Sequence, residues 1–465
     1  MEVLTQAPQP TIKCYHSISH GKAVKSLYME FTPSSFYYSG KNLLSYNFEN
    51  SVDNFGGGFS FTVKEDIKTI SEISIAQEFK QNFMDAVQPL DIIVISESGT
   101  EKIDFIGVVT KVSIGGIASN LNKSVTVSGK SIEWLYLYYN INTDIKACIF
   151  QNTEANNAFK LDLAAQAGQS PISIKDIATS SFKVFKQRTS ENAEVSNTVI
   201  GDIIDLWYGK DFIIASMDKF AYPISSNMFD SGKIDVISFI RKLFPQPLYE
   251  IFGFIDDMNK PKICIRMAPY DNPYATYTIE PVQLTDFTLT RSCEEVYTAF
   301  MPYIEGSSMS SDFYMNLQAA ESGTKEKGYN SAKANQEKVS IYGYQLLTSS
   351  FVGYAPDTKN NKETLNNQKI NELAEKLEKW FSKLDEMYAG DLTIVNITKD
   401  RCAKIGEWLS FAGGQFYINQ ARHSWNYGDN PMINYQVSRG GNYYNKTRTF
   451  TKLENLSAVY GEFVK

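Results

Sequence analysis

The chain has very little histidine, which argues against several kinds of chemistry. Its 465 residues include three histidines, His16, His20 and His423. General acid–base catalysis and zinc binding both depend heavily on this side chain. Cys14 precedes His16 and His20, but the segment is predicted to be extended and shows no fourth ligand, so we predict no metal site. No nucleophile accompanies His423, and we expect that residue to be structural.

Cysteine is also sparse and unpaired in pattern. The five cysteines are scattered, and none forms a Cys-x-x-Cys pair: Cys14, Cys148, Cys264, Cys293 and Cys402. This spacing excludes a disulfide framework. We expect each cysteine to be a small apolar core residue in a chain made in a reducing cytoplasm.

Excess positive charge and long apolar runs are both missing. The net charge is −7 and the isoelectric point about 5.3. No run of lysine and arginine is present, so tight binding of nucleic acid is not expected, although folding could assemble a local patch. The apolar runs are far shorter than the roughly 20 residues of a membrane helix. Residues 1–13 do not resemble a signal peptide. These features predict a soluble protein, cytoplasmic at synthesis and not exported by the usual route.

No cofactor or glycosidase motif is evident. Gly56–Gly58 lacks the lysine of a phosphate-binding loop and is most simply a turn. The adjacent acids Glu294–Glu295 and Asp256–Asp257 could not easily share a site on a strand, because neighbouring side chains of a strand point to opposite faces. More widely separated carboxylates cannot be paired from sequence, so a hidden cell-wall hydrolase activity stays open.

Aromatic residues are abundant and indicate β structure. They make up 13% of the chain, with 28 Tyr and 29 Phe, and they favour half-buried strands. Residues 59–63 alternate apolar with polar side chains, and 89–95 form an apolar run typical of a strand covered on both faces. Two more strands are expected at 105–112, with a bulge or bend at Gly107, and at 124–129. This spacing predicts a barrel or sandwich that ends in a short helical segment at 129–135.

The middle of the chain has a mixed pattern. Residues 136–230 are predicted to form an inserted α+β lobe with helices at 154–167 and 199–208. An amphipathic helix is expected at 234–244. A second β region follows, with strands at 248–254, 263–267, 286–290 and 296–303. Residues 306–335 are rich in Ser, Gly, Lys and Glu and are predicted to be a loop or flexible segment.

The strongest helical pattern spans 364–390 and is expected to stop at Gly390. Its apolar residues repeat every three or four positions, which fits either a helix on its own sheet or a trimeric coil. The seam is shorter than three heptads, so we favour the first interpretation. Strands at 392–397 and 408–411 are then followed by a hairpin, which runs from Gly413 to Trp425 and returns through 433–441.

Three blocks of this sequence together resemble a known family. The first is 125–135, with Gly129 and Trp134. The second is 263–271, with Arg266, Pro269 and Tyr270, continued by 291–300. The third is the C-terminal hairpin, with Phe416, Tyr417, His423, Trp425, Arg439 and Gly440. In this order the blocks are similar to central baseplate hub proteins of contractile-tailed phages and phage-like injection systems, the Mu-type and late-control-D-type hubs. Residues 136–230 and 306–335 show no such resemblance.

The resemblance implies a mainly β fold with α+β insertions and two tube-like antiparallel β-barrel domains, three copies of which form a pseudo-sixfold ring. The implied domains, in chain order, are the first barrel 1–135, the inserted lobe 136–230, the first part of the second barrel 231–305, the loop and amphipathic helix 306–390, the remainder of the second barrel 391–445 and the tail 446–465.

The resemblance further implies a structural, non-enzymatic role with no catalytic, metal or cofactor site. Such a homotrimer adapts a hexameric tail tube to a trimeric spike and forms part of a delivery channel in a particle's tail baseplate. Its expected partners are the tube, the spike and the wedge proteins, with the tape-measure protein as an additional candidate. The alternatives are a hub-like tail protein that degrades peptidoglycan and one that binds glycans or a receptor. The identity of the machine, contractile or not, stays open.

Overall fold

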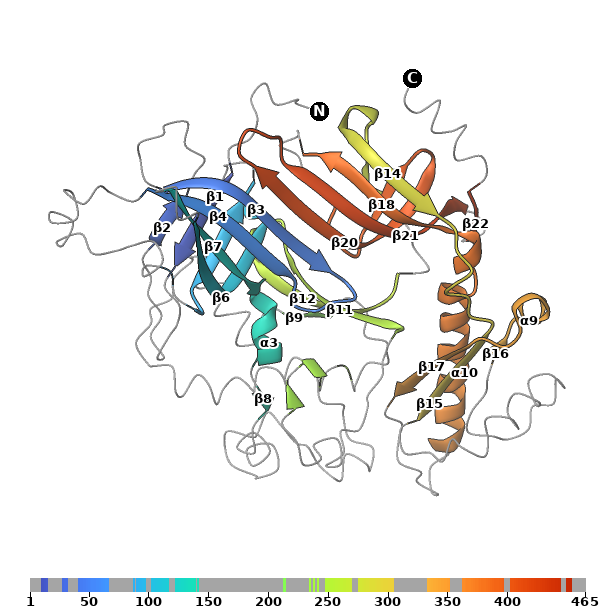
Figure 1. Cartoon of the computed structure of the whole chain (residues 1–465). Coiled ribbons are helices and arrows are strands. Elements are labelled where there is room, and N and C mark those ends of the chain that lie inside the picture. Colours follow the sequence, from blue (N-terminus) through green and yellow to red (C-terminus); the bar gives the residue numbers. More distant parts are fainter. Residues whose placement is uncertain are drawn as a thin grey trace, which may run out of the picture.

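The computed structural model describes about half of the chain in detail (Figure 1). The ranges it describes are 10–15, 27–31, 41–66, 87, 89–97, 102–116, 122–138, 140–141, 212–214, 234–235, 237–238, 241, 247–269, 275–304, 333–351, 362–396, 402–444 and 449–453. Strands predominate in these ranges, which confirms the prediction of a mainly β protein.

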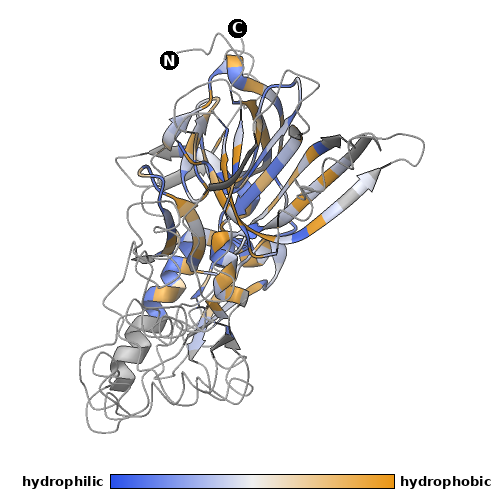
Figure 2. Cartoon of the chain, turned by 90° about the vertical axis from the view of Figure 1, so that its left-hand side faces the viewer, coloured by the Kyte–Doolittle hydropathy of each residue, from blue (hydrophilic) through white to orange (hydrophobic). Residues whose placement is uncertain are grey.

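The N-terminal strands form one antiparallel array. Its members are β1 (Thr11–Tyr15), β2 (Leu27–Phe31), β3 (Lys41–Ser51), β4 (Gly58–Asp66), β5 (Ile92–Ser96), β6 (Phe105–Gly116) and β7 (Asn122–Ser131), paired in the order β3-β4-β7-β6-β5-β1-β2. Hydrophobic and hydrophilic residues alternate along many strands (Figure 2). In β4, Phe59, Phe61 and Val63 are buried. All of β5 is buried, as its apolar run predicted.

Gly107 does not mark the bulge expected in β6. The register of β6 against β7 shifts between Val109 and Lys111. Gly107 is instead needed for close packing, because a Cβ there would lie 2.5 Å from the Phe59 ring. The irregularity in this strand therefore lies beyond Gly107, which contradicts the bulge expected at that position.

A short helical segment follows the array, as predicted. It consists of η2 (Ile132–Trp134) and α3 (Leu135–Tyr138), after which come the two-residue strand β8 (Asn140–Ile141), β9 (Phe212–Ile214) and β10 (Ile234–Asp235). Most of the predicted lobe, including the expected helices at 154–167 and 199–208, lies outside the described residues.

The helix expected from residue 234 begins later. Ile234 and Asp235 pair with β8, and helical backbone is described only at 237–238 and 241. Both carboxylate oxygens of Asp235 accept bonds from Ser238, one from its backbone N at 2.7 Å and one from its hydroxyl at 2.6 Å. This is the geometry of an N-cap, so the polar Asp235 fixes a start that the apolar periodicity did not reveal.

The second β region matches its predicted strands closely. It contains β11 (Tyr249–Ile255), β12 (Pro261–Met267), β13 (Ala275–Thr278), η6 (Pro281–Gln283), β14 (Leu284–Thr290) and β15 (Ala299–Ile304). Strand β12 was expected to alternate, but Ile263, Cys264 and Ile265 are all buried because β12 is the middle strand of the three-stranded sheet β11-β12-β9.

The helix α10 (Lys362–Phe381) is shorter than the pattern predicted. It is followed by η7 (Leu384–Glu386) and by β18 (Tyr388–Val395), so Gly390 lies in a strand and does not end the helix. The buried face of α10 consists of Leu373, Ala374 and Leu377. The helix contacts β15 and β16 (Lys333–Ala334). Figure 1 shows α10 beside the small sheet β16-β15-β17 (β17, Leu346–Phe351), with α9 (Gln336–Tyr342) close by. This supports a helix on its own sheet.

Strands from both predicted β regions meet in one large sheet, which does not include β11, β12 and β15. After β18 come β19 (Trp408–Phe411), β20 (Gly414–Asn426), β21 (Met432–Tyr444) and β22 (Thr449–Lys452), and the main path of the sheet is β14-β18-β21-β20-β3-β4-β7-β6-β5-β1-β2. The hairpin β20–β21 is therefore confirmed. It joins the N-terminal array through seven antiparallel residue pairs between β20 and β3, from Gln420–Ser51 to Asn426–Ser45.

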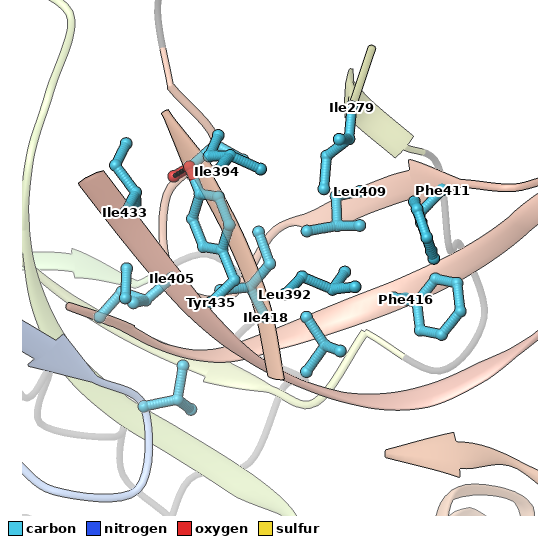
Figure 3. Close-up of a cluster of buried hydrophobic side chains, with 14 of the residues drawn as sticks. Ile279, Leu392, Ile394, Ile405, Leu409, Phe411, Phe416, Ile418, Ile433 and Tyr435 are labelled. Carbon is cyan, nitrogen blue, oxygen red and sulfur yellow. Dashed lines mark hydrogen bonds between the residues drawn. The ribbon is translucent and has the colours of Figure 1, made fainter. Parts of the chain in front are cut away.

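Strand β20 crosses two cores. Phe416 and Ile418 pack with Leu409, Phe411 and Tyr435 in the C-terminal core (Figure 3). Farther along the same strand, Trp425 packs in the N-terminal core with Tyr46 and Phe48.

 The two cores therefore share one strand, and the order of side chains along β20 sets how the two halves of the sheet meet.

Within the described part of the chain, no helix is both long and apolar enough to cross a membrane.

Candidate functional site

Five of the family-motif residues lie at two joints, both built on β20. In the first joint, Arg266 of β12 and Arg439 of β21 both contact Tyr417. The second brings His423 and Trp425 to β3. Sequence blocks that are far apart in the chain therefore meet in the fold. Tyr270 of the second block lies outside the described residues, and Pro269 is half-buried just after β12.

A buried ion pair forms the centre of the first joint. Arg266 Nε lies 3.0 Å from Glu250 Oε2 of β11. Arg266 Nη2 donates to the Tyr417 hydroxyl at 3.0 Å and also to the backbone carbonyl of Gly406. The Tyr417 hydroxyl in turn donates to Glu250 Oε1 at 2.5 Å. Burial acts to lower the pKa of Arg266, but Tyr417 and Glu250 outweigh it and the pKa is raised, so the guanidinium stays charged.

Arg439 completes this joint by stacking on aromatic rings. Its guanidinium carbon lies 4.0 Å from the Trp380 ring centroid, and it also faces Phe381 and Tyr417. Burial lowers the pKa of Arg439 to about 10. The backbone φ of Arg439 is 56°, a left-handed value that costs a residue with a Cβ some strain. Arg439 thus stacks on rings of both α10 and β20, and it links the helix to the hairpin.

Replacing Trp380 by leucine is expected to loosen this link. Leucine keeps an apolar side chain but removes the ring face, and a desolvated cation–π contact contributes about 1–2 kcal/mol. We expect faster hydrogen exchange in α10, while Trp380→Phe retains most of the protection. Equal protection in the leucine variant and the native protein would contradict a stabilising role for the stack.

Two of the motif glycines are required by close packing. A Cβ at Gly440 would lie 2.2 Å from the Phe416 ring, and one at Gly129 would lie 2.0 Å from the carbonyl oxygen of Val108. Trp134 packs beside Gly56, whose φ is 84°. These positions allow the strands to pack closely.

The second joint contains a buried carboxylate that sequence reasoning missed. Glu97, which follows β5, is 1% exposed. Its oxygens accept hydrogen bonds from Tyr46 and Asn396, each at 2.9 Å, and one lies 2.9 Å from His423 Nδ1. The His423 ring also stacks on Phe48, its partner in β3, with 4.3 Å between centroids. These five residues come from segments that are as much as 300 positions or more apart.

The charges around Glu97 oppose one another. Burial acts to raise the pKa of Glu97, but His423 and the hydrogen-bond donors outweigh it, so the pKa lies below its ordinary value. Asp104 accepts a bond from the Glu97 backbone N at 2.8 Å. Burial and the neighbouring Glu97 raise the pKa of Asp104. The cluster therefore holds one firmly ionised carboxylate beside a histidine.

A cleft of about 270 Å³ opens beside the second joint. His423, Asp104 and Lys102 contribute to its wall, together with the β11–β12 turn at 254–259 and the segment 402–405. Cys402 is half-buried there, and its thiol donates to Asn396 Oδ1 at 3.4 Å. No group of three or more His, Cys, Asp or Glu side chains that could hold a metal is found among the residues that the structure covers.

Several expectations about single residues need correction. Glu294–Glu295 and Asp256–Asp257 lie in turns, so the argument from opposite faces of a strand does not apply to them. Asp256 Oδ1 accepts the backbone N–H groups of Met258 and Lys260, so it is a turn-forming residue. Cys14 and Cys264 are buried as expected, whereas Cys293 is exposed and is not a core residue. His16, His20 and Cys148 fall outside the described ranges.

The two buried acids of the joints, Glu250 and Glu97, could be detected in the sequence only by their position beside apolar runs. Glu250 interrupts the apolar run of β11, and Glu97 comes directly after the apolar run of β5. A carboxylate at such a place is either exposed or paired in the interior, and the sequence does not tell which partner pairs with it.

Solved structures offer a likeness to this fold, although no protein-family model and no curated protein matches the sequence. A 43 kDa tail protein of prophage MuSo2 from Shewanella oneidensis is 11% identical, with 93% of this chain and 98% of that chain covered and a TM-score of 0.46. A tail protein from Neisseria meningitidis MC58 is 9% identical, with coverages of 92% and 96% and a TM-score of 0.47. The fold resembles that of phage tail proteins.

A third similar structure comes from a secretion system. The Escherichia coli c3393 protein, a component of the type VI secretion system, is 10% identical over 91% of this chain and 79% of that chain, with a TM-score of 0.39. Its description notes structural similarity to the bacteriophage T4 tail proteins gp27 and gp5. Similarity at this level does not transfer a function, so the function depends on the residues of this chain.

Proposed function

We propose that this chain is a structural hub at the centre of a phage tail or phage-like baseplate. In this proposal three copies form a pseudo-sixfold ring, divided within each chain into barrels and insertions at the boundaries given above. The ring adapts a hexameric tail tube to a trimeric spike and contacts the wedge proteins. Its role is structural and non-enzymatic, and the joints on β20 keep the two halves of each chain in a fixed relation.

The observation that carries the proposal is a polar face shared by strands of both halves. Paired residues of antiparallel strands point to the same side of a sheet. One such row runs across β14, β18, β21, β20 and β3 through Asp286, Thr393, Asn434, Arg422 and Glu49. A second row runs across β20, β3, β4, β7 and β6 through Ser424, Asn47, Ser60, Ser128 and Lys111. The opposite side of these strands carries the two cores.

The chemistry of this face suits a conduit. Hydroxyl and amide groups predominate in the two rows, and the charges are of both signs. Arg422 is paired with Glu49 at 2.8 Å, and Thr62 and Thr126 are linked at 3.1 Å. A strongly basic lining would retain DNA through its phosphates. A mixed polar lining lets nucleic acid or protein pass, so we assign this face to the channel.

The native mass of the protein tests the ring. We expect light scattering to give three times 52.5 kDa, and negative-stain images of the same peak to show a central hole. A stable monomer at every concentration would overturn the proposal. Release of sugar or peptide from purified cell walls would favour the hydrolase alternative instead.

Reagent access tests which face lines the hole. Cys293 is first replaced by serine, because it is exposed, and Asn47→Cys or Ile341→Cys is then introduced. Asn47 belongs to the polar face and Ile341 is 66% exposed on α9. In the trimer we expect a maleimide joined to a large polymer to label position 341 and not 47, while a small maleimide labels both. Equal labelling by the large reagent would remove the channel assignment.

A further inference from the structure

The seam between β3 and β20 contains a titratable contact, His423 with Glu97, that a structural ring does not require. His423 lies opposite Phe48 in this seam, and its side chain is 12% exposed where the cleft meets the joint. Its Nδ1 is directed to Glu97, whose side chain is 2% exposed. The other two donors to Glu97, Tyr46 and Asn396, are neutral. Among the hydrogen-bond partners found for this carboxylate, His423 is therefore the one that can supply a positive charge.

We propose that His423 is a proton-operated latch, closed when its ring is protonated, that holds the two halves of the sheet together at β3 and β20. The ligand of this site is a proton. A protonated ring forms a charge-assisted hydrogen bond to Glu97, and such bonds are stronger than neutral ones. Loss of the proton leaves a buried carboxylate with neutral donors, which makes opening of the seam easier.

The direction of the pH response follows from the other groups in the joint. The pKa of Glu97 is lowered, so its stabilising charge is present above the ordinary glutamate range and is lost only as the pH falls well into acid. Histidine ordinarily titrates between about pH 5 and 8. The latch therefore closes as the pH falls and opens as it rises.

Asp104 contributes a pH dependence of stability with the same sign as that of His423, so the two contributions must be separated by experiment. Its raised pKa means that its contribution to stability is full at low pH and is lost as the pH rises through its folded pKa. Lys102 pairs with Asp104 at 3.6 Å. Tyr46, Cys402 and Lys404, with Asp256 and Asp257 in the wall of the cleft, are further titratable groups near the joint. Tyrosine, cysteine and lysine ordinarily change charge above this pH range and aspartate below it.

Hydrogen exchange of the seam, corrected for the intrinsic pH dependence of exchange, tests the latch. In the native chain we expect residues 45–51 and 420–426 to open about fivefold more often at pH 8 than at pH 6, the order expected for a charged against a neutral hydrogen bond. The β4–β7 pairing serves as the internal reference and stays unchanged. No pH difference at the seam, or the same difference in the reference strands, would overturn the proposal.

Variants separate the latch from a merely structural histidine. Asp104→Asn alone is expected to retain the pH difference, and His423→Gln in the Asp104→Asn background to remove it and to leave the seam equally open at both values. Tyr46→Phe removes a neutral donor, so it should loosen the seam equally at pH 6 and pH 8. Glu97→Gln in the Asp104→Asn background provides a second route to the same loss of pH dependence should His423→Gln fail to fold. A full pH difference in either double variant would refute the latch while leaving the ring proposal intact.

Discussion

Gly129→Ala is expected to destabilise the N-terminal array by about 3 kcal/mol or more, because the strands cannot yield to the added methyl group. The new Cβ would lie 2.0 Å from the Val108 carbonyl oxygen and 2.6 Å from the Phe59 ring. The oxygen belongs to the backbone of the neighbouring strand β6, so relief requires β6 and β7 to separate. We expect a lower denaturant midpoint and loss of exchange protection in β6 and β7.

Gly115→Ala is the matched control for this prediction. Gly115 lies in the same strand pair, but a Cβ there would lie 3.5 Å from its nearest neighbour, the Ser124 hydroxyl. That is an ordinary contact, and the lost backbone freedom of the unfolded chain favours alanine slightly. Equal effects of the two substitutions would show that close packing at Gly129 is not what matters.

Arg266→Met is expected to cost about 3–5 kcal/mol, the usual result of leaving one partner of a buried ion pair alone. Glu250 would lose its counter-ion while still facing the Tyr417 hydroxyl. Arg266 and Glu250 have side chains only 19% and 9% exposed, so water replaces little of the lost interaction. We expect the C-terminal half to unfold at a lower denaturant concentration, and hydrogen exchange in β11, β12 and β20 measures this.

A double-mutant cycle separates the ion pair from simple packing. Glu250→Leu should be as damaging as Arg266→Met, whereas both together should cost much less than the sum, because no charge is then left buried. The exposed pair Arg422–Glu49, with side chains 60% and 33% exposed, provides the control. There Arg422→Met should cost less than about 1 kcal/mol. Additive effects at Arg266 and Glu250 would contradict the proposed coupling.

The sequence predicted most of the individual strands, because their signal is local. Alternation in β4, the apolar run of β5 and the punctuated hairpin β20–β21 each lie within a few adjacent residues. Helix boundaries were less predictable. The apolar repeat of α10 continues past Phe381 through Leu384 and Met387, yet the chain turns into η7 and β18 there. Periodicity reports a buried face and does not report where a strand partner takes over from a helix.

The partners of the joints could not be predicted in the same way. Arg266, Tyr417 and Arg439 are motif positions, but nothing near them in the sequence indicates Glu250 or Trp380. Glu97 belongs to no motif, although it pairs with His423 across 326 positions. Each pair depends on how strands from distant segments are aligned, and hydrophobic pattern alone does not set that alignment.

By itself the sequence determined that this is a mainly β protein with a final hairpin, little histidine and no excess of positive charge, since composition and local alternation carry that information. Only the tertiary structure decided that strands from both β regions meet in one sheet, with one polar face and two buried charged joints on β20. The physical reason is that a buried carboxylate is stable only beside its donors, and those donors come from strands that meet only after the chain has folded.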